Sequence, residues 1–207
     1  MSRSGRLLTA ALLVLTACMP SASSPIPSAS GSPPSASVAP PGEPSASGSA
    51  EPIDSDTPSG GLPAFVCDLP ITGAASIGLA HLADVRVGTH AGYDRIVFEF
   101  MEDGTPEFRI EAAEPPFTMD PSGMPMAVNG STFLQIVFNG GTKVGDDGSP
   151  TYTGPTEFGP GFDQLVDLIE RGDFEAVNNW YVGMAGEGCL RALVLSDPSR
   201  VVIDLEH

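Results

Sequence analysis

The fold of this chain depends on two similar stretches of sequence, Asp94-Arg95-Ile96-Val97-Phe98-Glu99-Phe100 and Ser199-Arg200-Val201-Val202-Ile203-Asp204-Leu205. Each stretch reads arginine, apolar, valine, apolar, acid, apolar. Because successive side chains of a β-strand point to opposite faces, this alternation predicts two strands. Arginine, valine and acid then share one face of each strand, and the larger apolar residues share the other.

We predict that these two strands pair antiparallel and in register. Arg95 would then lie across from Asp204, and Arg200 across from Glu99, so that opposite charges face each other between the strands. Placement of the two strands in different sheets would contradict this hypothesis.

Period-2 alternation dominates from residue 82 onward, where Gly, Pro and Asp mark the turns. About seven strands are expected, near residues 85–87, 96–100, 108–112, 132–138, 176–184, 190–195 and 201–205. One segment has a different period: its apolar residues, from Phe162 to Ile169, recur at i, i+3, i+4 and i+7. This spacing predicts one amphipathic helix between Pro160 and Gly172. The predicted fold is mainly β, an antiparallel β-sandwich or a strongly bent sheet, with the helix closing one side.

The N-terminus has the features of an export signal. Arg3 and Arg6 precede an apolar run, residues 7–15, that is too short for a permanent membrane-spanning helix. Leu15-Thr16-Ala17-Cys18 then resembles the lipobox of bacterial lipoproteins, whose cysteine is acylated and becomes the mature N-terminus. We therefore predict a signal peptide over residues 1–17 and a lipid anchor on Cys18, which holds the chain on the outside of the cell membrane. The alternative is ordinary secretion with an incidental cysteine.

Composition divides the remaining chain into a tether and a domain. Residues 18–62 consist largely of Ser, Pro, Ala and Gly and contain no aromatic residue. Such a segment cannot bury enough apolar area to offset its conformational entropy, so we predict a disordered linker. Residues 63–207 are long enough for one folded domain.

Two cysteines remain after Cys18 is assigned to the lipid anchor. Cys67 and Cys189 lie near the two ends of the predicted domain, and an extracytoplasmic compartment is oxidising. We predict a disulfide between them. A metal site is the alternative, but two thiols with no nearby histidine are a poor set of ligands.

Charge and missing motifs exclude several classes of function. The formal net charge is −17, and a negative field disfavours binding to nucleic acid and adsorption to anionic lipid. The common metalloprotease, hydrolase and nucleotide-binding motifs do not occur in the sequence. We therefore expect no catalysis, no cofactor and no metal.

Five residues are candidates for ligand binding, namely His90, Tyr93, Arg95, Trp180 and Arg200. Trp180 could stack on the sugars of a glycan, although a single tryptophan on a strand is also typical of a core. The two arginines could bind anions, or form ion pairs that stabilise the fold. His90, in a glycine-flanked turn, could contact a ligand or bond the turn backbone.

Three blocks of sequence together resemble the AMIN-like domain of secreted bacterial lipoproteins, over roughly residues 80–207. The blocks are Val85 to Phe98, Gly172-Asp173-Phe174-Glu175 with Trp180 following, and Asp197-Pro198-Ser199-Arg200-Val201-Val202-Ile203-Asp204. The resemblance implies a non-catalytic β-sandwich module that directs its protein to peptidoglycan or to envelope assemblies.

The expected function is therefore that of a module that docks to peptidoglycan or to an envelope protein. One alternative is a solute-binding lipoprotein of a transporter, which would need a large cleft. The other is a cell-envelope hydrolase, which would need clustered acids in a cleft; Asp146-Asp147 and Glu111 with Glu114 are the nearest candidates.

Overall fold

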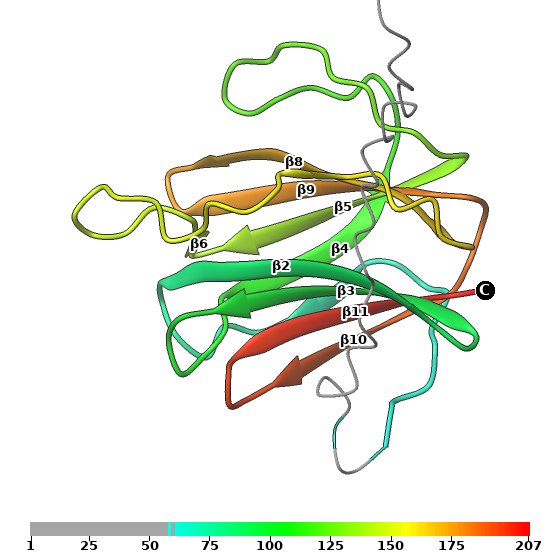
Figure 1. The fold of residues 1–207 in the computed structure, drawn as a ribbon, viewed down its shortest axis with the longest axis horizontal. Coiled ribbons are helices and arrows are strands. Elements are labelled where there is room, and N and C mark those ends of the chain that lie inside the picture. The colour runs from blue at the N-terminus through cyan, green and yellow to red at the C-terminus, as the bar shows by residue number, and fades with distance from the viewer. Residues whose placement is uncertain (1–57, 59–60) are drawn as a thin grey trace, which may run out of the picture. The chain divides into compact units, whose positions relative to one another are not determined.

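The computed structural model describes Pro58 and residues 61–207, which contain β-strands and no helix (Figure 1). The strands are β1 (Ile71–Gly73), β2 (Ala80–His90), β3 (Tyr93–Phe100), β4 (Glu107–Ala113), β5 (Thr132–Asn139), β6 (Gly141–Thr142), β7 (Glu157–Phe158), β8 (Leu165–Phe174), β9 (Val177–Met184), β10 (Leu190–Leu195) and β11 (Arg200–Glu206). The predicted signal peptide, Cys18 and nearly all of the predicted tether lie outside the described residues. None of the described residues belongs to a helix long and apolar enough to cross a membrane.

The strands form two sheets. One has the order β1-β4-β5-β9-β8-β7, and the other has the order β10-β11-β3-β2-β6. Within the described residues, paired strands run antiparallel except for the short parallel pairing of β2 with β6. The seven strands predicted from the sequence are all present. The others are β8 and three strands of two or three residues, β1, β6 and β7.

The predicted pairing of the two arginine-led strands is confirmed. β3 and β11 are antiparallel neighbours, with Arg95 opposite Asp204 and Arg200 opposite Glu99. Their larger apolar residues point to the other face of the sheet, where they belong to the main core. The alternation read from the sequence therefore assigns both faces of these strands correctly.

Side chains from both sheets meet in one hydrophobic core. Phe98, on β3, packs edge-on against Phe138 of β5 at 4.8 Å between ring centroids and against Trp180 of β9 at 5.5 Å. In Figure 1, β2, β3, β11 and β10 lie below β8, β9, β5 and β4. Large aromatic rings packed edge to face in this way provide much of the apolar burial that holds two sheets together.

The helix prediction is wrong, because the segment concerned forms part of strand β8. This strand pairs with β9, and its register shifts twice, at Val166 and at Arg171. A β-bulge inserts one extra residue, so Leu165 and Leu168 both reach the core although they are three positions apart. A regular strand would place them on opposite faces. Of the apolar residues that suggested a helix, Leu165 faces the core and Val166 is the extra residue of the bulge, so their spacing follows an irregular strand and not a helical turn.

The segment before β1 is also part of the fold. Val66 and Leu190 exchange two backbone hydrogen bonds of 2.8 and 2.9 Å, and the predicted disulfide joins Cys67 to Cys189. Phe65 lies over the guanidinium of Arg191, at 4.2 Å from the ring centroid. Residues 62–67, the N-terminal segment, thus cover part of the outer face of the five-stranded sheet.

Candidate functional site

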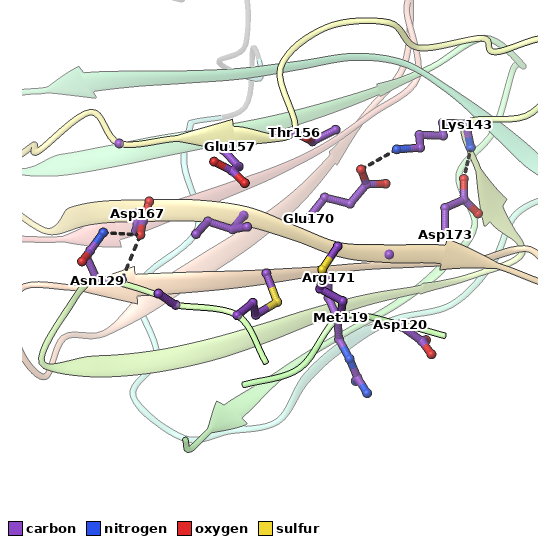
Figure 2. A pocket seen from close by; sticks show the side chains of 15 residues that line it. Met119, Asp120, Asn129, Lys143, Thr156, Glu157, Asp167, Glu170, Arg171 and Asp173 are labelled. Carbon is purple, nitrogen blue, oxygen red and sulfur yellow. Dashed lines mark hydrogen bonds and ion pairs between the residues drawn. The ribbon is translucent and has the colours of Figure 1, made fainter. Parts of the chain in front are cut away.

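A groove of about 900 Å³ runs along β8, near the edge where the short strand β7 pairs with it (Figure 2). Its floor is β8. One wall is the β4–β5 loop, residues 114–131, and the other is formed by residues 156–159 and Lys143. The groove is open to solvent, and both polar and apolar side chains line it.

The β4–β5 loop is anchored on the outer face of the six-stranded sheet by an aromatic side chain. Phe117 is buried and packs against Phe133 at 4.8 Å and against Tyr181 at 4.9 Å between ring centroids. Beyond this anchor the loop turns back on itself, with the Met119 amide donating to the Met124 carbonyl at 2.8 Å. Met119 and Met124 remain 44% and 61% exposed, so the loop presents apolar side chains beside the groove.

Hydrogen bonds join this loop to the strands beneath it at both of its ends. The Asp120 amide donates to the Arg171 carbonyl at 2.8 Å. Asn129 donates to the Asp167 carboxylate twice, from its amide at 2.8 Å and from its side chain at 3.0 Å. At Gly183 the Asn129 carbonyl approaches so closely that no side chain would fit. The wall of the groove is therefore held in place before any ligand binds.

The acids at the other end of the groove serve the fold. Lys143 donates to Glu170 at 2.5 Å, and the other oxygen of Glu170 accepts a bond of 3.0 Å from Asn178. Asn178 in turn accepts the indole N–H of Trp180 at 2.6 Å. Asp173 accepts the Lys143 amide at 2.5 Å. These carboxylates therefore accept hydrogen bonds that hold Lys143 and β9 in place at this end of the groove.

Two charged side chains of the groove are different. Among the described residues, neither the Asp120 carboxylate nor the Arg171 guanidinium has a hydrogen-bond or ion-pair partner, and Arg171 Nε is buried. The Arg171 guanidinium lies 5.7 Å from the centroid of the Tyr181 ring. No group of His, Cys, Asp and Glu side chains in the described part of the chain is arranged to hold a metal ion.

The sequence did not single out Asp120 or Arg171. The available signal was the length of the β4–β5 loop, because a long segment between two paired strands is often functional. A second available signal was the presence of three methionines in that loop, Met119, Met124 and Met126, because methionine is frequent at adaptable binding surfaces.

Arg95, a predicted binding residue, holds the fold together. It donates to Asp204 through Nε at 2.6 Å and through Nη2 at 2.9 Å, and Arg191 donates to the same acid at 2.7 Å. Arg95 and Asp204 are both 0% exposed. A ligand could not reach Arg95 without opening this cluster. In the structure, Arg95 therefore forms an ion pair that stabilises the fold.

His90 and Tyr93 lie beside this cluster. Their rings stack at 4.7 Å, and the guanidinium groups of Arg191 and Arg95 lie 4.7 and 5.2 Å from the centroid of the Tyr93 ring. The structure therefore brings three of the five predicted residues together. Arg200 is at the other end of β11, is buried, and donates to the carbonyl of Pro198 at 3.0 Å.

Trp180 is a core residue and not a platform for a sugar. It is 0% exposed and packs against Phe98 and Phe158, with its only polar atom bonded to Asn178. A buried indole cannot stack on a glycan. The physical reason is its position on the inward face of a central strand, which the residue type alone does not reveal.

Comparison with known proteins identifies the family. The model of the AMIN-like domain matches residues 80–207, from the first residue of β2 to the end of the chain. No curated protein and no solved structure matches this chain. The family match covers more than half of the sequence and includes both arginine-led strands and the floor of the groove, and the chain therefore belongs to the AMIN-like domain family.

Proposed function

We propose that this chain is an extracytoplasmic, membrane-anchored lipoprotein whose AMIN-like domain docks to peptidoglycan. The observation that carries the proposal is an open, preformed groove on a domain of a family associated with the cell envelope. An envelope protein is the second candidate for the docking partner.

The anchor and the domain boundary are part of the same proposal. Cys18 would carry the lipid, residues 18–62 would form the tether, and residues 63–207 would form a β-sandwich module. Contacts of the N-terminal segment support a boundary near residue 62, since Leu62 packs against a small cluster made by Val97, Leu193 and Val202. The disulfide lies at the end of this segment, at Cys67, and would fasten the end of the tether to the domain.

A binding role fits the groove better than catalysis does. General acid–base chemistry needs carboxylates that are free to exchange protons beside a substrate. Asp167, Glu170 and Asp173 instead accept hydrogen bonds from neighbouring groups. A transporter's solute-binding protein would need a deep cleft that encloses its ligand, whereas this groove is open to solvent along one strand.

Docking is tested by sedimentation with purified sacculi. We expect the full-length chain, purified in detergent, to sediment with peptidoglycan and to be retained weakly by membrane extract. Retention by membrane extract alone would favour an envelope protein as the partner. Retention by neither would overturn the docking proposal.

The anchor is tested separately. Mass spectrometry of the mature protein is expected to show an acylated Cys18 at the N-terminus, and Cys18→Ser should release the protein from the membrane fraction. An unmodified, unprocessed N-terminus would contradict the anchor and leave the docking proposal unaffected.

A further inference from the structure

Two oppositely charged side chains lie next to each other in the groove without pairing. The backbone hydrogen bond from the Asp120 amide to the Arg171 carbonyl, 2.8 Å long, brings the two residues together. Figure 2 shows the Arg171 guanidinium and the Asp120 carboxylate on the same side of β8, opposite to Glu157 and Glu170. Among the described residues no ion pair joins the two side chains; the Arg171 guanidinium lies over the Tyr181 ring, 5.7 Å from its centroid, and no acid matches its charge.

The position of Arg171 argues against an accidental surface charge. Arg171 is the extra residue of a β-bulge, where the register with β9 shifts between Glu170 and Gly172. Bulges re-aim a side chain out of the regular pleat and are frequent next to functional sites. The buried Nε without a partner adds a cost that a purely structural arginine would avoid.

From this geometry we infer that the groove binds the zwitterionic end of an amino acid, that is, an ammonium and a carboxylate on one carbon. The guanidinium of Arg171 receives the carboxylate, for which its planar fork is well shaped, and Asp120 receives the ammonium. Met119 and Met126, which also line the groove, contact the aliphatic chain that carries the group.

This inference rests on the proposed function and names its ligand. Peptidoglycan stem peptides that contain a diamino acid carry such zwitterionic ends, and free amino acids carry them too. Neutral sugars would use neither charge. Ligands with carboxylates alone would be repelled by the negative field of the chain, whose formal net charge is −17.

The test uses the full-length chain and three preparations of sacculi: untreated, acetylated at free amines, and amidated at free carboxylates. Asp120→Asn and Arg171→Gln are compared with the matched controls Asp68→Asn and Arg109→Gln, which change exposed residues outside the groove. We expect each groove variant, and each chemical treatment, to weaken binding about tenfold, because one charge-assisted contact is lost. The control variants should bind like the wild type, and thermal melting should show that all four variants fold.

General electrostatics predicts the opposite sign for one variant. Asp120→Asn makes the chain less negative, so non-specific attraction to an anionic wall would strengthen, as it would for Asp68→Asn. Weaker binding of Asp120→Asn, with no weakening for Asp68→Asn, therefore supports the inference. Equal binding of wild type and groove variants, or of treated and untreated sacculi, would overturn the zwitterion inference. It would leave the proposed docking to peptidoglycan intact.

A titration with free meso-2,6-diaminopimelic acid separates the two sources of the ligand. Binding of this acid by the wild type but not by Asp120→Asn, with no retention on sacculi, would overturn the proposed docking and support the ligand class. Failure of both probes would overturn both proposals.

Discussion

Arginine and aspartate residues are neighbours on the outer faces of both sheets, but they are ion-paired on one sheet and not on the other. On the five-stranded sheet Asp204 accepts bonds from Arg95 and Arg191, and Arg95 and Asp204 are both 0% exposed. On the six-stranded sheet Asp120 and Arg171 are partly exposed and have no partner among the described residues.

The difference shows that residue type does not separate a structural charge from a binding charge. A buried, fully bonded cluster contributes to one folded arrangement and loses it when one member is removed. Two partly exposed charges that do not form an ion pair contribute little to folding and remain free to bind a ligand. The two faces therefore predict opposite responses to the same substitution.

The largest expected effect is that of Asp204→Asn. The substitution leaves two buried guanidinium groups without their counter-charge, so we expect a loss of about 3–5 kcal/mol in the free energy of unfolding. Urea denaturation followed by tryptophan fluorescence measures it, because Trp180 is in the core. Asp120→Asn should stay within about 0.5 kcal/mol of wild type. Equal losses in the two variants would erase the contrast between the faces.

Removal of the disulfide tests the N-terminal segment, which covers part of the outer face of the five-stranded sheet. We call this the closed face, because its charges are paired and buried. We expect the double change Cys67→Ser and Cys189→Ser to lower the free energy of unfolding by about 2–4 kcal/mol, because the bridge closes a long loop. Calorimetry with and without reductant checks the wild type in parallel. A reductant that leaves the melting temperature of the wild type unchanged would show that this bridge does not stabilise the domain.

A smaller effect is expected from Gly183→Ala. This variant tests the open face, that is, the outer face of the six-stranded sheet, which carries the groove. The added methyl group would collide with the Asn129 carbonyl, a backbone atom that can move only if the β4–β5 loop lifts. We expect a loss of about 1–3 kcal/mol and weaker retention on sacculi. Faster hydrogen exchange at residues 126–131 would report the displaced loop, and unchanged exchange there would mean that the loop is not clamped at this point.

The smallest effect concerns pH, at a pair that belongs to neither arginine site, His81 and Glu102. Burial alone would raise the pKa of Glu102, but hydrogen bonds donated by the His81 amide and ring outweigh it and hold the pKa below its ordinary value of 4.5. The ionised form is thus favoured in the folded state, so its contribution is present above pH 4.5 and disappears as the pH falls through the lowered pKa. Melting curves of Glu102→Gln and wild type should converge in this acidic range. A constant difference at every pH would contradict the assignment.

The strands and their faces could be predicted because the signal is local. Val97 and Val202 lie between an arginine and an acid in the same order on both strands, and this repetition specified the register as well as the faces. The disulfide was predictable because two cysteines remained once Cys18 was assigned elsewhere.

The groove could not be predicted in the same way, because its parts come from distant segments. Asp120 and Arg171 become neighbours only when the β4–β5 loop folds over the sheet and bonds to β8. The bulge at Arg171 also disguises the strand, since it breaks the period by which strands are recognised. The burial of Trp180 could not be read from its residue type for a related reason, because burial depends on the neighbouring sheet.

Hydrogen–deuterium exchange of the full-length chain, with and without soluble peptidoglycan fragments, tests most directly which outer face docks. If the open face is the docking surface, the fragments will slow exchange in residues 117–129 and 156–173 and leave the closed face unchanged. Slower exchange confined to residues 62–66 and 190–205 would place docking on the ion-paired face and contradict the account.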